Sequence, residues 1–153
     1  LAAFACVQDH YNLLDRRIER ELVPLCQAEG LGIMTYSAVA VGLLTGLFRH
    51  GQTPPAGTLW ARSPDRFRQV MTPAADAVVE ALVAIAAARG RTPAQVAVAW
   101  VLSRPGISAA MIGPDAPEQV DENLGGFGWE LSEEEIQTLD RASAWAVNTG
   151  QIV

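Results

Sequence analysis

The chain has 153 residues, 50% of them hydrophobic, which is enough for one domain of ordinary size. Its formal net charge of -6 comes from acidic residues scattered along the chain, and this argues against a nucleic-acid-binding protein, which needs a concentrated basic surface. All 11 basic residues are Arg and there is no Lys, so chemistry that requires a lysine amine is excluded.

The two cysteines, Cys6 and Cys26, have no metal-binding spacing to each other or to His10 and His50, so we expect neither a disulfide nor a metal site. We expect two buried thiols in a reducing cytoplasm. No apolar run reaches the roughly 20 residues that cross a bilayer, and there is no signal-peptide pattern, so we expect a soluble protein without a membrane partner. Because strand-like residues follow directly on Leu1, we interpret residues 1–153 as a single fragment of a larger protein.

The first predicted elements are a strand and a helix. Residues 4–9 predict a short strand, and residues 11–16 a connection. Residues 17–29 carry apolar side chains at helical spacing, and Gly30 supplies the stop signal. Pro24 lies inside this helix, where it is unfavourable unless the helix kinks.

Residues 31–36 are apolar and partly β-branched, and small residues follow them, which predicts a buried parallel strand. Ligands of α/β folds bind beyond the carboxyl ends of such strands, so Tyr36 and Ser37 mark a candidate site. An aromatic face followed by a hydroxyl and small residues suits a flat, phosphate-bearing ligand. The alternative is a core strand that happens to end in Tyr-Ser.

Residues 45–73 form a long excursion with little periodicity. Loops of this length in compact domains are usually functional or mobile, so we expect an active-site or cofactor-covering loop. The alternative, a disordered insertion, fits poorly with Phe48, Trp60 and Phe67, because these aromatic side chains need a surface to pack on.

The rest of the chain alternates helices with one further strand, which predicts parallel strands joined by right-handed crossovers. Three strands with covering helices make part of a sheet and not a closed barrel. The expected elements are a helix over Pro73–Arg89, a helix from the capping box of Thr92 and Gln95 through Ser103, a strand over 107–112, a helix over 116–124, and a helix from Ser132 to about Ala144.

Several motifs, taken together and in order, resemble the second half of an aldo-keto reductase. They are residues 7–16 (VQDHYNLLDR), Tyr36-Ser37 with 42–46 (GLLTG), 92–97 (TPAQVA), and Ile112-Gly113 with 117–119 (PEQ) and 122–124 (ENL). The likeness is greatest to the branch that includes bacterial oxidoreductases and potassium-channel β subunits. It implies an α/β fold, the C-terminal part of a TIM (β/α)8 barrel with about three parallel strands, which this chain alone does not close.

The resemblance also implies a nicotinamide dinucleotide site. Gln8 matches the residue that hydrogen-bonds the nicotinamide carboxamide, and Tyr36 the ring that stacks on the nicotinamide. The remaining matches fall along the rest of the cofactor. They are Ser37, Val39, Gly42 and Gly46 around the pyrophosphate, Arg62 and Arg66 closing over it from the long loop, and Gly113, Gln119, Glu122 and Asn123 at the adenosine end.

Several positions depart from the family pattern. Ala38 stands where the family has Pro, and Leu47 where it often has a basic residue. Asp115 and Ala116 stand where the family places Ser and then Arg or Lys to bind the adenosine 2'-phosphate. A carboxylate at Asp115 would repel that phosphate and accept hydrogen bonds from a free hydroxyl, so we expect a weaker preference for NADP and possible use of NAD. The alternative is that Asp115 caps the following helix.

The family's catalytic Tyr, Lys, Asp and His come from the first half of its barrel. This chain has no Lys, Tyr11 and Tyr36 belong to other motifs, and His10 lies outside the family's His motif. We therefore expect no catalytic residue here and no carbonyl reduction without the missing N-terminal half-barrel. The full-length protein is expected to be an NAD(P)H-dependent enzyme that acts on a small-molecule carbonyl or alcohol. The alternatives are a nucleotide-binding regulatory or redox-sensing protein and an inactive truncated chain.

Overall fold

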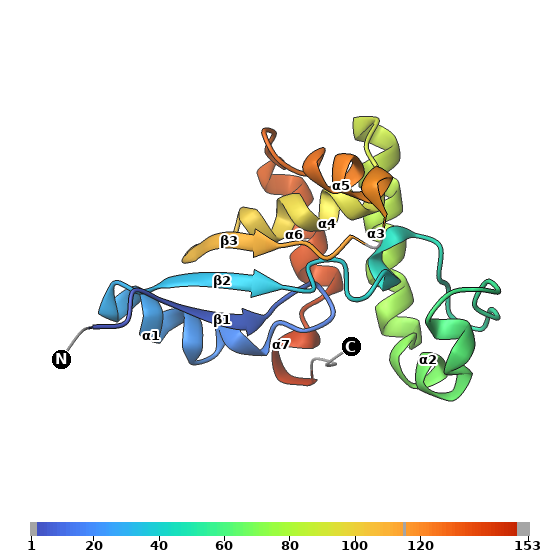
Figure 1. The fold of residues 1–153 in the computed structure, drawn as a ribbon, viewed down its shortest axis with the longest axis horizontal. Helices are drawn as coiled ribbons and strands as arrows, with labels where there is room; N and C mark the ends of the chain where they lie inside the picture. The colour runs from blue at the N-terminus through green and yellow to red at the C-terminus, as the bar shows by residue number, and fades with distance from the viewer. Residues whose placement is uncertain (1–2, 115, 150–153) are drawn as a thin grey trace.

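The computed structural model describes residues 3–114 and 116–149. Strands β1 (Cys6–His10), β2 (Gly32–Tyr36) and β3 (Ile107–Met111) form one parallel sheet in the order β1-β2-β3. Figure 1 shows the strands side by side and pointing in one direction. All three predicted strands are confirmed, with boundaries that differ by at most two residues.

Helices fill the connections between and after the strands. They are α1 (Leu22–Glu29), α2 (Pro64–Val70), α3 (Pro73–Arg89), α4 (Pro93–Leu102), α5 (Pro117–Leu124), α6 (Glu133–Ala142) and α7 (Ala146–Thr149), with 3₁₀ turns at Arg17–Glu19, Leu43–Thr45 and Trp60–Arg62. Within the described ranges no single helix is long and apolar enough to cross a membrane. Helices α2 and α3 together are long and apolar enough, by length and composition only, but they are bent by 77° relative to each other.

Local sequence sets the ends of the long helices. The Thr72 hydroxyl accepts a hydrogen bond from the Ala75 amide at the start of α3, and Pro73 follows as the first helical residue. Reciprocal capping boxes open α4, from Thr92, and α6, from Ser132. Gly90 ends α3 in the left-handed conformation, with a φ of 61°. The predicted caps at Thr92 and Ser132 are confirmed.

The predicted helix over 17–29 is wrong in its first part. Residues Arg17–Glu19 form a 3₁₀ turn, and α1 begins only at Leu22. Pro24 therefore lies in the first turn of α1, where backbone amides have no intrahelical partner, and no kink is needed.

The excursion over 45–73 contains α2 and a 3₁₀ turn, and its aromatics pack together as expected: the ring of Phe67 lies 6.0 Å from Phe48 and 6.2 Å from Trp60. Its role in covering a cofactor stays a prediction. The expectation of two buried cysteines is wrong for one of them. Cys26 is buried as expected, but Cys6 is exposed, since its face of β1 has no covering helix.

The sheet has one covered and one open face. In β2, Ile33 and Thr35 are buried against the helices, whereas Met34 is half-buried and Tyr36 is exposed. Register pairs Gln8 with Met34, and paired residues of parallel strands point to the same side. Gln8 and Tyr36 therefore share the open face.

A buried arginine joins the connection after β1 to α6. Arg16 is 5% exposed, and its Nε and Nη2 donate to the two carboxylate oxygens of Glu19 at 2.8 and 2.9 Å. Its Nη1 donates to the Ser143 hydroxyl at 2.9 Å and to the Asp140 carbonyl at 3.2 Å. These bonds compensate a buried charge and fix the segment that leads out of β1.

Trp100 of α4 lies at the centre of the same network. The guanidinium carbons of Arg16 and Arg104 each lie 5.1 Å from the centre of its ring, and the Tyr11 ring packs 5.3 Å away. The indole N–H donates to Asp140 at 3.1 Å. The ring of Trp100 is fully buried. It therefore joins α4 to the segment after β1, through Tyr11 and Arg16, and to α6, through Asp140.

An ion pair between α3 and α6 predicts an acid-sensitive part of the stability. Arg89 donates to both oxygens of Glu135 at 2.7 Å and lowers the pKa of Glu135 from 4.5 to about 2. A carboxyl whose pKa is lower in the folded state than in the unfolded state stabilises the fold when the pH is above its unfolded pKa. This contribution is lost as the pH falls from about 4.5 through about 2. Glu135→Gln, which keeps a capping-box side chain, should flatten the dependence of the unfolding free energy on pH in that window.

The control for this prediction is Glu134→Gln in the same turn, measured by urea unfolding at matched pH values. Glu134 is exposed, so its replacement should leave the slope unchanged. Equal slopes for the wild type and Glu135→Gln would contradict the prediction.

Candidate functional site

The carboxyl ends of the three strands meet at one rim of the sheet. His10 ends β1 and pairs in register with Tyr36, which ends β2. The Tyr36 ring is 40% exposed, and the buried His10 ring meets it edge-on, with centroids 5.2 Å apart and planes at 71°. This contact fixes the orientation of an exposed aromatic ring and leaves ring surface available for a flat ligand.

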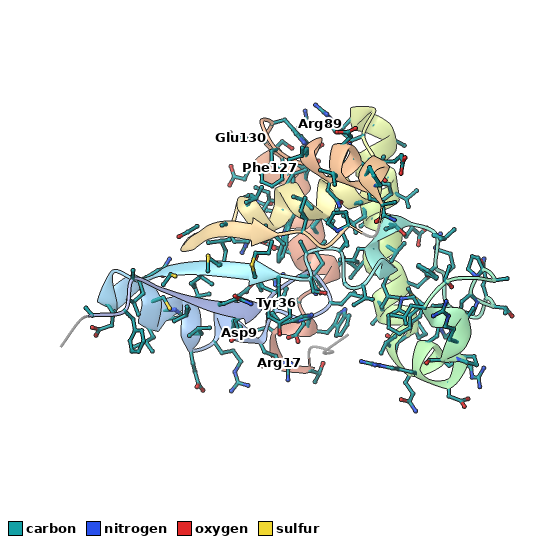
Figure 2. All side chains as sticks on the ribbon, viewed as in Figure 1. Asp9, Arg17, Tyr36, Arg89, Phe127 and Glu130 are labelled. Atoms are coloured by element: carbon teal, nitrogen blue, oxygen red, sulfur yellow. The ribbon has the colours of Figure 1, made fainter. Side chains whose placement is uncertain are left out.

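A hollow of about 380 Å³ opens beside Tyr36. Figure 2 shows Tyr36, Asp9 and Arg17 together on this side of the molecule, from β2, β1 and the segment after β1. The hollow is lined by Asp9, His10, Asp15, Arg17, Ile18, Arg20, Glu21, Leu22 and Tyr36. The lining carries both acidic and basic side chains, so its charge does not favour a ligand of one sign. The Tyr36 ring at its edge instead favours a ligand with a flat group that can stack on it.

A buried carboxylate underlies the hollow. Arg17 donates from Nε and Nη2 to the two oxygens of Asp15 at 2.8 and 2.7 Å, and Nδ1 of His10 lies 3.3 Å from Asp15 Oδ2. Although the His10 contact is close enough for an ion pair, Nδ1 makes no hydrogen bond with any residue the structure describes. Burial alone would raise the pKa of Asp15, but the His10 and Arg17 side chains outweigh it and hold that pKa well below its usual range.

The turn that follows β2 adopts an unusual backbone. Ser37, Ala40 and Val41 have positive φ angles of 62°, 50° and 51°, and Gly42 follows at 84°. A β-branched residue such as Val41 rarely adopts this conformation, so surrounding contacts must hold the turn. One of these contacts is the Trp60 indole N–H, which donates to the Val41 carbonyl at 2.9 Å and anchors the long excursion on the turn.

The same turn carries unpartnered hydrogen-bond donors. Ser37 Oγ is buried and has no hydrogen-bond partner among the described residues. The backbone amides of Val39 and Gly42 likewise donate to no other residue in the ranges 3–114 and 116–149. A buried hydroxyl and free amides in one left-handed turn can donate hydrogen bonds to an anion such as a phosphate.

The remaining predicted residues lie on β1, after β3 and on α5. Gln8 lies on the open face, and Gly113 follows β3, whose Met111 pairs with Tyr36. Gln119, Glu122 and Asn123 lie on α5 at helical spacing, with Glu122 exposed and Asn123 half-buried. Asp115 falls outside the described residues.

Two predicted residues, Arg62 and Arg66, lie on the excursion and not on the turn after β2. Arg62 lies in a 3₁₀ turn and Arg66 in α2, and both are exposed. In Figure 1, α2 lies on the side of the molecule toward which the strands point. Within the described part of the chain, neither guanidinium contacts Tyr36 or Ser37. Gly46, by contrast, has a φ of 85° and ends the 3₁₀ turn of the β2 connection.

Sequence reasoning missed the polar residues beneath the rim, chiefly Asn12 and Asp15. The signal that could have found them is a short Asn-to-Asp turn, because Asn side chains bond to backbone two or three residues ahead. Nothing local indicates that Asn12 also reaches the turn after β2. Among the described residues there is no group of three or more His, Cys, Asp or Glu side chains that could hold a metal ion.

Comparison with known proteins agrees with this architecture. The profile of the Aldo/keto reductase family matches residues 1–144. The chain is 30% identical over 142 residues to Protein tas from Escherichia coli K12. It is 33% identical over 144 residues to NADH-specific methylglyoxal reductase from the same organism. Each match includes 92% of this chain. It is 35% identical over 121 residues, 76% of its length, to a putative voltage-gated potassium channel subunit beta from Schizosaccharomyces pombe.

A solved structure gives the same result. The glycerol dehydrogenase AKR11B4 from Gluconobacter oxydans superposes with a TM-score of 0.77 at 30% identity, over 95% of this chain and 44% of that one. The chain also spans only 40%, 42% and 35% of the lengths of the three relatives above. Its open three-stranded sheet accordingly corresponds to part of the TIM barrel of that structure. Since the family profile and the fold agree over nearly the whole length, the chain belongs to the aldo/keto reductase family.

Proposed function

We propose that this chain supplies the nicotinamide dinucleotide site of an aldo-keto reductase that moves a hydride between NAD(P)H and a small carbonyl or alcohol. The observation that carries the proposal is the buried, unpartnered Oγ of Ser37, next to the exposed ring of Tyr36 at the carboxyl end of β2. An aromatic ring and an unsatisfied hydroxyl on adjacent residues match a planar ring and a phosphate in one ligand.

The nicotinamide end of the site is formed by Tyr36 and Gln8. The Tyr36 ring, held by His10, would stack on one face of the nicotinamide and leave the other face for hydride transfer. Gln8 lies on the same face of the sheet, one strand away, and its amide offers both a donor and an acceptor to the carboxamide.

The phosphate end is formed by the turn after β2. The Ser37 hydroxyl and the amides of Val39 and Gly42 would donate to the pyrophosphate oxygens, as successive donors in turns with left-handed residues do in other anion sites. Gly46 closes this turn. Arg62 and Arg66 would approach the pyrophosphate from the excursion that Trp60 anchors on Val41.

The adenosine end would be formed by the segment after β3. Gly113 follows β3, and the space where a side chain at Gly113 would stand is open. Gln119, Glu122 and Asn123 lie on α5. We propose that the carboxylate of Asp115 weakens the preference for NADP. The relative named NADH-specific methylglyoxal reductase, 33% identical, supports use of NAD.

The proton-transfer groups would come from outside these 153 residues. The chain has no Lys, and its relatives are more than twice as long. We propose that it is the C-terminal part of the barrel, that the other part completes the sheet and supplies the catalytic side chains, and that the 153 residues alone reduce no carbonyl. The bound cofactor supplies the hydride, while this chain orients the nicotinamide and holds the phosphates.

Tyr36→Ala should weaken binding of NADH about tenfold, because the stacking surface is lost. Isothermal titration calorimetry of the purified chain measures this directly. The matched control is Phe127→Ala, whose side chain is 39% exposed against 40% for Tyr36 and lies far from it, near Arg89 and Glu130 (Figure 2). Equal weakening by both substitutions, or none by Tyr36→Ala, would refute the proposed site.

A further inference from the structure

We propose that Asn12 is a positioning residue that holds the Ser37 hydroxyl in place for the ligand's phosphate. This inference rests on the proposed function, because it assumes that the turn after β2 binds a dinucleotide. Asn12 is fully buried, and its side chain bridges the turn after β1 and the turn after β2, which lie 25 residues apart in the sequence.

The oxygen of the Asn12 side chain shapes its own turn. Oδ1 accepts hydrogen bonds from the amides of Leu14 at 2.8 Å and Asp15 at 3.0 Å. The backbones of Asn12 and Asp15 also bond to each other in both directions at 3.1 Å. This tight turn leaves the Asn12 side chain in one orientation, so that its amide nitrogen points to a fixed place.

The nitrogen of the Asn12 side chain reaches the second turn. Nδ2 donates to the Ser37 carbonyl at 3.0 Å, and the same carbonyl accepts from the Ala40 amide at 2.9 Å. Two donors fix the peptide plane that follows Ser37, whose φ of 62° is unfavourable for a residue with a side chain. The backbone conformation of Ser37 sets the position of its Cβ, so by holding that backbone Asn12 sets the point from which the unpartnered hydroxyl projects.

The second hydrogen of the Asn12 amide faces His10. Nδ2 lies 3.4 Å from His10 Nε2, while the other ring nitrogen of His10 faces Asp15 at 3.3 Å. Nε2 is therefore the His10 ring nitrogen within hydrogen-bond distance of the Asn12 amide, whereas Nδ1 faces the Asp15 carboxylate without a hydrogen bond among the described residues. The contact of Nδ2 with His10 is longer than its hydrogen bond to the Ser37 carbonyl, so Ser37 is the residue through which we expect Asn12 to act.

The inference is tested with a double-mutant cycle on NADH affinity. Asn12→Ser keeps a short oxygen that can accept from the Leu14 and Asp15 amides, and it removes the donor to Ser37. We expect Asn12→Ser and Ser37→Ala each to weaken NADH binding about tenfold. If Asn12 acts through Ser37, the double variant should also lose only about tenfold, whereas independent effects would multiply to about a hundredfold.

A second substitution and a control make the test decisive. In Asn12→Asp the side chain keeps nearly the same size but places an oxygen against the Ser37 carbonyl, so NADH binding should weaken at least as much as in Asn12→Ser. This variant is used in the cycle if Asn12→Ser does not fold. Thr72→Ala removes the cap of α3, away from the rim, and should lower stability without changing NADH affinity.

The outcomes separate this inference from the proposed function. A wild-type chain that does not bind NADH overturns both. A wild-type chain that binds, with Asn12 variants that bind equally well or with additive losses in the double variant, overturns only the role of Asn12. A shared loss of about tenfold in the two single variants and the double variant supports it.

Discussion

Replacement of Arg16 by Met is expected to lower the free energy of unfolding by about 3–5 kcal/mol. The guanidinium is buried and bonded to Glu19, Ser143 and the Asp140 carbonyl. Met has a similar length but no donor, so the Glu19 carboxylate and the fully buried Ser143 hydroxyl would each lose a partner. Urea unfolding followed by circular dichroism measures the loss as a lower midpoint.

The matched control is Arg20→Met, four residues along the same segment. Arg20 is exposed, so its replacement should change the free energy of unfolding by no more than about 0.5 kcal/mol. Similar small losses for both substitutions would show that the Arg16 network contributes little and that other contacts fix the course of the chain after β1.

Replacement of Trp100 by Ala is expected to lower the free energy of unfolding by about 3–5 kcal/mol. Trp100 is fully buried in the core, and its loss would leave a cavity beside Tyr11. It would also remove the ring over which Arg16 and Arg104 lie and the indole donor to Asp140. The measurement is again urea unfolding followed by circular dichroism, because the substitution changes the tryptophan fluorescence itself.

Two further variants separate volume from the polar contacts. Trp100→Phe keeps most of an aromatic ring and should recover part of the loss, since the cavity is smaller. Trp129→Ala removes a half-buried indole that also lies under an arginine, Arg91, at 5.2 Å, and should cost less than about 2 kcal/mol. Equal losses at Trp100 and Trp129 would show that burial does not govern the effect.

Tyr11 connects the Trp100 network to the candidate site. Tyr11 packs on Trp100, donates from its hydroxyl to Glu19, and donates from its amide to the Tyr36 carbonyl at 3.3 Å. His10 and Asn12 flank it, and both contact the site. Substitutions in the network should therefore be checked for NADH affinity as well as for stability.

Much of the architecture follows from sequence alone because it depends on neighbours in the chain. The caps at Thr72, Thr92 and Ser132 fix where α3, α4 and α6 begin, since each contact spans only three residues. The motifs likewise identify the family and mark Tyr36 and Ser37 at the end of a strand, which is where the structure has them.

What only the tertiary structure decided depends on contacts between distant segments. The sequence pattern did not predict α2, because its residue Phe67 is fixed by Phe48 and Trp60. Likewise, no local pattern indicates that Arg16 bonds to Ser143, 127 residues away, or that Asn12 bonds to Ser37. The sequence therefore determined the strands, the helices α3 to α6 and the family, while the buried polar contacts beneath the rim emerged only when the folded chain brought their partners together.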